Sequence, residues 1–135
     1  MTVANDPGQK LRVLLVDDNV EGCRALARFL EINGYAVTVA TTGTSAFEAI
    51  AAGPAPDIVL TDLILPDADG REVARRARQL TPTPRIALIT GWSIDHDAEN
   101  TARDFDWVIM KPLDMRSLVT KLRAAASGEK APILP

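Results

Sequence analysis

Five polar residues stand where short apolar runs of the chain end. Three are carboxylates, one is a hydroxyl and one is an ammonium: Asp17, Asp18, Asp62, Thr90 and Lys111. If the apolar runs are parallel strands of one sheet, their carboxyl ends lie at one edge, where ligands bind at the point at which strand order reverses. The sequence therefore predicts a site for a metal ion and a phosphoryl group at that edge.

The three carboxylates of this set need a cation. At a separation of about 4 Å, each pair repels by roughly 4 kcal/mol when the effective dielectric constant is about 20. Ligand sets made only of oxygen favour Mg²⁺, with Mn²⁺ as the alternative. With the carboxylates ionised and Lys111 protonated, the cluster keeps two net negative charges, which one divalent ion neutralises.

These residues then suit a phosphoryl transfer. An oxygen of Asp62 is expected to attack phosphorus in line, while Lys111 pairs with one phosphoryl oxygen and the Thr90 hydroxyl donates a hydrogen bond to another. The expected product is an aspartyl phosphate.

The elements that must position these residues alternate along the chain. Apolar and β-branched runs predict strands at 11–16, 36–40, 57–62, 86–90 and 107–110. Helical periodicity predicts helices at 20–32, 45–52, 70–80 and 115–126, with a polar one within 95–103. Their expected N-caps include Asn19, Thr44 and Asp114. Five strands alternating with five helices predict a three-layer α/β/α sandwich around a parallel sheet.

Composition bounds the class of protein. A chain of 135 residues, 47% of them apolar, is one domain. We expect flexible tails at 1–10 and 127–135 around a folded unit at 11–126. No apolar run approaches the roughly 20 residues of a membrane span, and no signal peptide is recognisable, so a cytoplasmic protein is expected.

Charge and cysteine content narrow the class further. A net charge of −3 argues against general binding to nucleic acid or to anionic membranes. Cys23 is the only cysteine, which excludes an intrachain disulfide. It lies on the apolar stripe of the first predicted helix and is interpreted as a core residue.

Four motifs at strand ends, in this order, resemble the receiver domain of two-component response regulators. They are the segments 16–19, 60–70, 90–91 and 111–112, and the resemblance covers about 11–126. It implies a flavodoxin-like sheet of order 2-1-3-4-5 and a cis peptide bond between Lys111 and Pro112. The phosphoryl donor would be a histidine kinase or a histidine phosphotransfer protein.

The same resemblance implies roles for individual residues. Asp62 would be the phosphoacceptor. Asp17, Asp18 and Asp62 would hold Mg²⁺ together with the backbone carbonyl of Ile64. Thr90 and Lys111 would contact the phosphoryl group, and the domain would not be an enzyme beyond its own phosphotransfer and slow dephosphorylation.

Two positions depart from the family pattern. An aromatic residue often stands three positions before the lysine, whereas this chain has Val108, so an aromatic rotamer switch is absent. Gly91 follows Thr90 where alanine is common, and it leaves more room beside the phosphate. We therefore expect the segment 90–94 to move toward the phosphoryl group, with Trp92 as a reporter.

Two other classes of function stay open at this point. A phosphohydrolase similar to haloacid dehalogenases also uses an aspartyl phosphate, but it needs a second acid where this chain has Asn19. An interaction module without phosphorylation would keep only the fold. Asp67, Asp69 and Gly70 are interpreted as turn residues, with a special backbone angle at Gly70.

The partners are predicted by class alone. We expect a kinase or phosphotransfer protein upstream, an unknown protein target downstream, no direct contact with nucleic acid, and a monomer or weak dimer. The residues after the last predicted helix are too few for an effector, so we expect either a stand-alone receiver or the receiver part of a longer protein.

Overall fold

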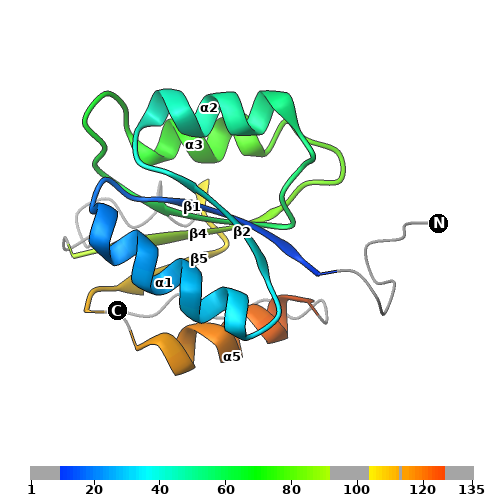
Figure 1. The fold of residues 1–135 in the computed structure, drawn as a ribbon. Helices are drawn as coiled ribbons and strands as arrows, with labels where there is room; N and C mark the ends of the chain where they lie inside the picture. Colours follow the sequence, from blue (N-terminus) through cyan, green and yellow to red (C-terminus); the bar gives the residue numbers. More distant parts are fainter. Residues whose placement is uncertain (1–9, 92–103, 113, 127–135) are drawn as a thin grey trace.

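The chain forms a five-stranded parallel sheet with helices on both faces (Figure 1). The computed structural model describes residues 10–91, 104–112 and 114–126. The strands are β1 (Arg12–Val16), β2 (Ala36–Ala40), β3 (Ile58–Asp62), β4 (Arg85–Thr90) and β5 (Trp107–Met110). Their order is β2-β1-β3-β4-β5, as the resemblance to receiver domains implies.

Four helices are described. They are α1 (Val20–Ile32), α2 (Gly43–Ala52), α3 (Gly70–Ala77) and α5 (Met115–Ala126). In Figure 1, α1 and α5 cover one face of the sheet and α2 and α3 cover the other, which gives the expected three layers. The helix predicted within 95–103 and the tails 1–9 and 127–135 fall outside the described residues. Within the described part of the chain, no helix has the length and apolar character of a membrane span.

Burial on both faces explains why the central strands read as continuous apolar runs. Residues of β1, β3, β4 and β5 alternate between two buried clusters, because successive side chains of a strand point to opposite faces. Trp107 packs toward α1 and α5, whereas Val108 packs toward α2 and α3. These two neighbours in β5 therefore point to opposite faces of the sheet.

The first helix follows its sequence signals closely. Asn19 is the N-cap of α1, and its side-chain oxygen accepts a hydrogen bond from the Gly22 amide at 3.0 Å. Gly34 ends the turn after α1 with a φ of 96°, a conformation that favours glycine. At the other end of the chain, Asp114 accepts hydrogen bonds from the amides of Arg116 and Ser117, as expected of the α5 cap.

Two helix boundaries differ from the predictions. The N-cap of α2 is Thr42 rather than Thr44, because Thr42 and Ser45 form a reciprocal capping box. The helix α3 ends at Ala77 rather than at Leu80. The amides of Gln79 and Leu80 bond to carbonyls three residues earlier, so a tighter turn replaces the α-helical pattern there.

Candidate functional site

Parallel pairing brings the five predicted site residues to one edge of the sheet. Asp17 directly follows β1, and Lys111 directly follows β5. Asp62 and Thr90 are the last residues of β3 and β4. All four strands run in the same direction, so their carboxyl ends lie together.

The three carboxylates form a cluster with the chemistry of a metal site. Asp17, Asp18 and Asp62 each offer one oxygen, and these oxygens all lie within 4.8 Å of one another. Asp18 is exposed, whereas Asp17 and Asp62 are partly buried. An all-oxygen set open to solvent on one side suits Mg²⁺, which retains several of its waters when it binds to proteins. The donor set therefore fits the predicted ion.

Lys111 connects two members of this cluster. Its Nζ lies 3.2 Å from Oδ2 of Asp17 and 3.0 Å from Oδ2 of Asp62. Partial burial lowers the pKa of Lys111, but the hydrogen bonds and charges of Asp62 and Asp17 outweigh burial and hold that pKa above its usual value. The peptide bond from Lys111 to Pro112 is cis, as the resemblance implies.

Backbone amides orient the two carboxylates that Lys111 contacts. Oδ1 of Asp17 accepts a hydrogen bond from the Asn19 amide at 3.0 Å, and Oδ1 of Asp62 accepts one from the Leu63 amide at 2.8 Å. One oxygen of each carboxylate is thus held by the local backbone. The other oxygen of each faces the ammonium.

Asn19 has a structural role in this loop. Its side-chain oxygen is engaged at the start of α1, and it carries no acid. A haloacid-dehalogenase-like phosphohydrolase requires a second acid at this position, and Asn19 does not supply one. Nothing in the geometry of this loop favours that alternative.

The residues expected to respond to a phosphoryl group are only partly described. Thr90 is fully buried at the end of β4, and Gly91 is exposed directly after it. Among the described residues, a Cβ added at Gly91 would lie 3.9 Å from Cβ of Lys111, an ordinary contact, and the extra room beside a phosphoryl group stays a prediction. Val108 is buried against the α2 and α3 side, and Trp92 lies outside the described residues.

Gly70 has a different reason to be glycine from the predicted one. Its φ is not positive, so no special backbone angle is required. A Cβ added at Gly70 would instead overlap the carbonyl oxygen of Asp62. Because the Gly70 amide also donates to the Leu63 carbonyl at 2.7 Å, the start of α3 packs directly against the end of β3.

The loop between β3 and α3 contains two carboxylates, Asp67 and Asp69, and the sequence did not indicate the role of Asp67. Asp69 is the N-cap of α3 and accepts from the Arg71 amide at 2.7 Å. Asp67, interpreted as a turn residue, instead bonds to the start of α2. The hydroxyl-rich sequence before α2 was the only signal for this contact, and it does not reveal a partner more than twenty residues away.

Cys23 is buried, as predicted, and it also contacts the acidic loop. Its Sγ donates a hydrogen bond to the Asp17 carbonyl at 3.2 Å. Burial, and next the negative charge of Asp17, raise the pKa of Cys23 to about 11. The thiol is therefore neutral at physiological pH and acts as a small core side chain with one weak donor.

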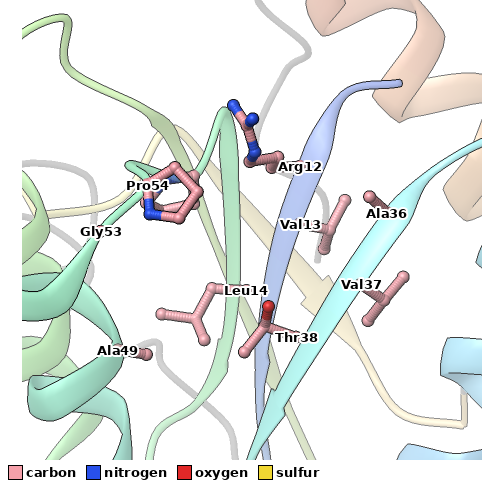
Figure 2. Close-up of a pocket in the computed structure, with 10 residues that line it drawn as sticks. Arg12, Val13, Leu14, Ala36, Val37, Thr38, Ala49, Gly53 and Pro54 are labelled. Atoms are coloured by element: carbon pink, nitrogen blue, oxygen red, sulfur yellow. The ribbon is translucent and has the colours of Figure 1, made fainter. Parts of the chain in front are cut away.

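Of two hollows, one adjoins the acidic edge of the sheet and the other does not. One of about 290 Å³ adjoins the acidic site between α1 and the segment after β5, and Asp17 and Lys111 line it. The other, of about 230 Å³, lies between β1, β2 and the end of α2 (Figure 2). Among the described residues that line the second hollow, Arg12 is the one that carries a charge. Of the three clustered carboxylates, Asp17 lines the first hollow and none lines the second.

Known proteins resemble this chain over most of its length. A family model described as the response regulator receiver domain matches residues 13–123. The response regulator receiver protein CpdR of Brucella abortus is 37% identical over 116 residues, which cover 82% of this chain and 92% of CpdR. The transcriptional regulatory protein KdpE of Mycobacterium tuberculosis is 35% identical, over 88% of this chain but only 52% of its own length.

Solved structures agree with the sequence matches. A CheY-like receiver domain protein from Methanospirillum hungatei has a TM-score of 0.80 at 27% identity, with 89% of this chain and 96% of that one covered. CheY4 of Vibrio cholerae, at 24% identity, shows the same fold with a TM-score of 0.75 over 85% of this chain and 98% of its own. This chain spans nearly all of CpdR and about half of KdpE.

Proposed function

The chain belongs to the response regulator receiver domain family, and from that premise we propose that it accepts a phosphoryl group on Asp62 and thereby changes its affinity for a partner protein. The observation that carries the proposal is the contact of one ammonium, on Lys111, with both Asp17 and Asp62 inside a cluster of three carboxylates. A cation on one side of Asp62 and acidic ligands on the other suit the approach of a phosphoryl group.

Metal binding is part of this proposal. Asp17, Asp18 and Asp62 would hold Mg²⁺, with Mn²⁺ as a substitute, and the backbone carbonyl of Ile64 would be a further ligand. The ion supplies charge neutralisation at the phosphoryl oxygens. Receiver domains bind Mg²⁺ at an acidic pocket of this kind, and the oxygen donors present here match that ion.

The transfer step changes few bonds. A carboxylate oxygen of Asp62 forms a bond to phosphorus while the bond from phosphorus to the donor breaks, and the leaving group takes the electron pair. Lys111 moves its hydrogen bond from Oδ2 of Asp62 to a phosphoryl oxygen. The Thr90 hydroxyl donates to another phosphoryl oxygen, and the space beside Gly91 admits the group.

The response to phosphorylation follows from charge. The phosphoryl group adds about one negative charge and strong hydrogen-bond acceptors at the end of β3. The Thr90 hydroxyl is drawn toward these acceptors, and the segment 90–94 moves with it. Because Val108 replaces the usual aromatic residue, loop and helix repacking rather than a ring rotation transmits the change to the partner surface.

The partners follow from the family. Response regulators receive phosphoryl groups from histidine kinases or histidine phosphotransfer proteins, and they act on downstream targets. We propose the same classes for this chain, acting in the cytoplasm as a monomer or weak dimer. The match covers only 52% of KdpE, so it does not identify the downstream target of this chain.

The proposal is tested by intact mass after incubation with acetyl phosphate. The wild type is expected to gain one phosphoryl group when Mg²⁺ is present and none when EDTA removes it. The variant Asp62→Asn is expected to gain none. Asp69→Asn is the matched control, because it removes a nearby carboxylate yet retains a side chain that caps α3, and it should be phosphorylated like the wild type.

Two results would contradict the proposal. The first is an adduct that persists in Asp62→Asn. The second is the absence of both an adduct and released inorganic phosphate from folded wild type, which excludes rapid self-hydrolysis as the reason for a missing adduct.

A further inference from the structure

Asp67 ties the loop after β3 to the start of α2. Its Oδ1 accepts a hydrogen bond from the Gly43 amide at 2.7 Å, and its Oδ2 accepts from the Thr44 amide at 3.0 Å and the Thr44 hydroxyl at 2.6 Å. Hydrogen bonding, above all by the Thr44 hydroxyl, holds the pKa of Asp67 below its usual value. The carboxylate is thus ionised and accepts three hydrogen bonds at neutral pH.

This contact adds to the helix's own capping residue. The capping box of Thr42 and Ser45 already satisfies the Ser45 amide. The amides of Gly43 and Thr44 are the first two of α2, and no group within a helix can accept from amides at that position. Asp67 takes both of them, and its negative charge lies at the positive end of the helix.

The loop that carries Asp67 is closed on itself. Ile64 and Asp69 form an antiparallel bridge, the Leu65 amide donates to the Ala68 carbonyl at 3.1 Å, and the Gly70 amide donates to the Leu63 carbonyl at 2.7 Å. The bridge links the backbone of Ile64 to the loop in which Asp67 lies. A displacement of Asp67 is therefore expected to reach the Ile64 backbone through this closed loop.

The approach of α2 to this loop is close enough to require glycine. A Cβ added at Gly43 would overlap Cβ of Ala68, although Gly43 does not have a positive φ. The start of the helix thus meets the loop through the close approach of Gly43 to Ala68 and through the hydrogen bonds of the Gly43 and Thr44 amides and the Thr44 hydroxyl to Asp67. A side chain at position 43 would force the helix and the loop apart.

We propose that Asp67 is a positioning residue for the metal site, because its bonds to α2 hold the backbone of Ile64 where its carbonyl completes the ligand set of Asp17, Asp18 and Asp62. This inference rests on the proposed function, which makes the Ile64 carbonyl a ligand. It adds that Mg²⁺ affinity depends on Gly43 and Thr44, which begin α2, an element that contains none of these ligands.

Mg²⁺ titration of the whole chain tests the inference, with the backbone amide shifts of Asp17 and Leu63 followed by NMR. Asp67→Asn and Asp69→Asn each remove one negative charge from the same loop, but only the first weakens the contact with α2. Asp67→Asn is expected to weaken Mg²⁺ binding by roughly tenfold, as loss of an outer-shell partner typically does. Asp69→Asn should weaken it by less than about threefold.

Two further measurements separate positioning from charge and from stability. Thr44→Val removes one hydrogen bond without changing charge, and it should weaken Mg²⁺ binding severalfold. Because coupling between two sites is reciprocal, Mg²⁺ should slow hydrogen exchange at the Gly43 and Thr44 amides of the wild type.

The outcomes are distinct. Equal weakening by Asp67→Asn and Asp69→Asn would mean that only charge matters, and it would overturn the inference. A lower melting temperature of metal-free Asp67→Asn with Mg²⁺ affinity no lower than that of Asp69→Asn would also overturn it, because Asp67 would then act as a helix cap alone. Mg²⁺ binding that is absent from wild type, or unchanged in Asp62→Asn, would overturn the proposed function together with this inference.

Discussion

Lys111 occupies a position between two carboxylates that a metal ion also has to neutralise. Its ammonium contributes one positive charge next to Asp17 and Asp62, at 3.2 and 3.0 Å. This charge stabilises the metal-free site and opposes a second cation there. The same residue therefore lowers the affinity for Mg²⁺ and, under the proposed function, assists phosphoryl transfer.

Replacing this ammonium is expected to separate the two effects. Lys111→Met should raise Mg²⁺ affinity by roughly threefold to tenfold, because a like charge leaves the site, and it should slow phosphorylation by acetyl phosphate. Calorimetric titration with MgCl₂ and intact mass over time measure the two quantities. Lys121→Met is the control, because it removes the same charge from α5, where the Lys121 ammonium donates a hydrogen bond to Ser117. Unchanged or weaker Mg²⁺ binding in Lys111→Met would contradict the expectation.

The pH dependence of these ion pairs has a definite sign. The pKa of Lys111 is raised above 10.5, the value of an unperturbed lysine. A group with a raised pKa in the folded state contributes stability that is fully present below its unfolded pKa and is lost as pH rises through its folded pKa. As far as Lys111 is concerned, the pairs therefore persist at neutral pH and are lost when the ammonium deprotonates in strongly alkaline solution.

At the scale of single residues, the sequence was enough to predict the residues of the acidic edge, but it did not reveal the residues that hold them in place. Asp17, Asp62 and Lys111 could be found because each ends an apolar run. Asp67 could not, because its three donors lie 23 or 24 residues earlier and no local pattern links them. For Gly70 the sequence indicated glycine for a turn, whereas the close approach of the Asp62 carbonyl is what requires it.

Among the elements, the start of α3 lies directly against the end of β3. Gly70→Ala would place a Cβ against the Asp62 carbonyl, so it should lower the free energy of unfolding by about 1 to 3 kcal/mol. It should also slow phosphorylation, because the displaced backbone carries Asp62. Urea unfolding and intact mass measure these changes.

Gly91→Ala is the matched control for this substitution. Its added Cβ would meet Cβ of Lys111 at 3.9 Å, an ordinary contact, and its φ is not positive. Its free energy of unfolding should stay within about 1 kcal/mol of the wild type. If both variants unfold at the same urea concentration, the close approach at Gly70 has no energetic consequence.

The sequence predicted whether each segment is a helix or a strand better than it predicted where each helix begins and ends. Asn19 and Asp114 were found as caps because each directly precedes the first apolar residue of its helix. Before α2 the sequence offers four hydroxyls among five residues, at 41, 42, 44 and 45, and only the three-dimensional arrangement selects Thr42. For α3, the apolar spacing continues to Leu80 while the hydrogen bonding tightens after Ala77.

For the molecule as a whole, the carboxylate cluster should couple metal binding to stability. Mg²⁺ at about ten times its dissociation constant should raise the free energy of unfolding by about 1.4 kcal/mol, or the melting temperature by roughly 5 °C. Asp18→Asn should abolish most of this gain and leave the metal-free protein at least as stable as wild type, because repulsion among the carboxylates falls.

Thermal unfolding with and without MgCl₂ measures this coupling, with NaCl of equal ionic strength as the control for screening. A gain of the same size in Asp18→Asn would show that Mg²⁺ acts elsewhere on the protein.

The arrangement of the whole molecule was predictable in part. Alternating strands and helices were enough to predict three layers around a parallel sheet. They do not determine strand order, because several orders satisfy the same alternation, and the order 2-1-3-4-5 came from the motifs shared with receiver domains. The structure also adds the second hollow beside β2 (Figure 2), for which the sequence holds no signal.

The acidic edge draws its residues from the ends of four strands, and Lys111 is the last of them to leave the ribosome. A nascent chain, or one cut by a protease before β5, retains Asp62 but lacks the ammonium that pairs with it. Under the proposed function, a kinase thus finds a competent substrate only after synthesis and folding of the sheet are complete.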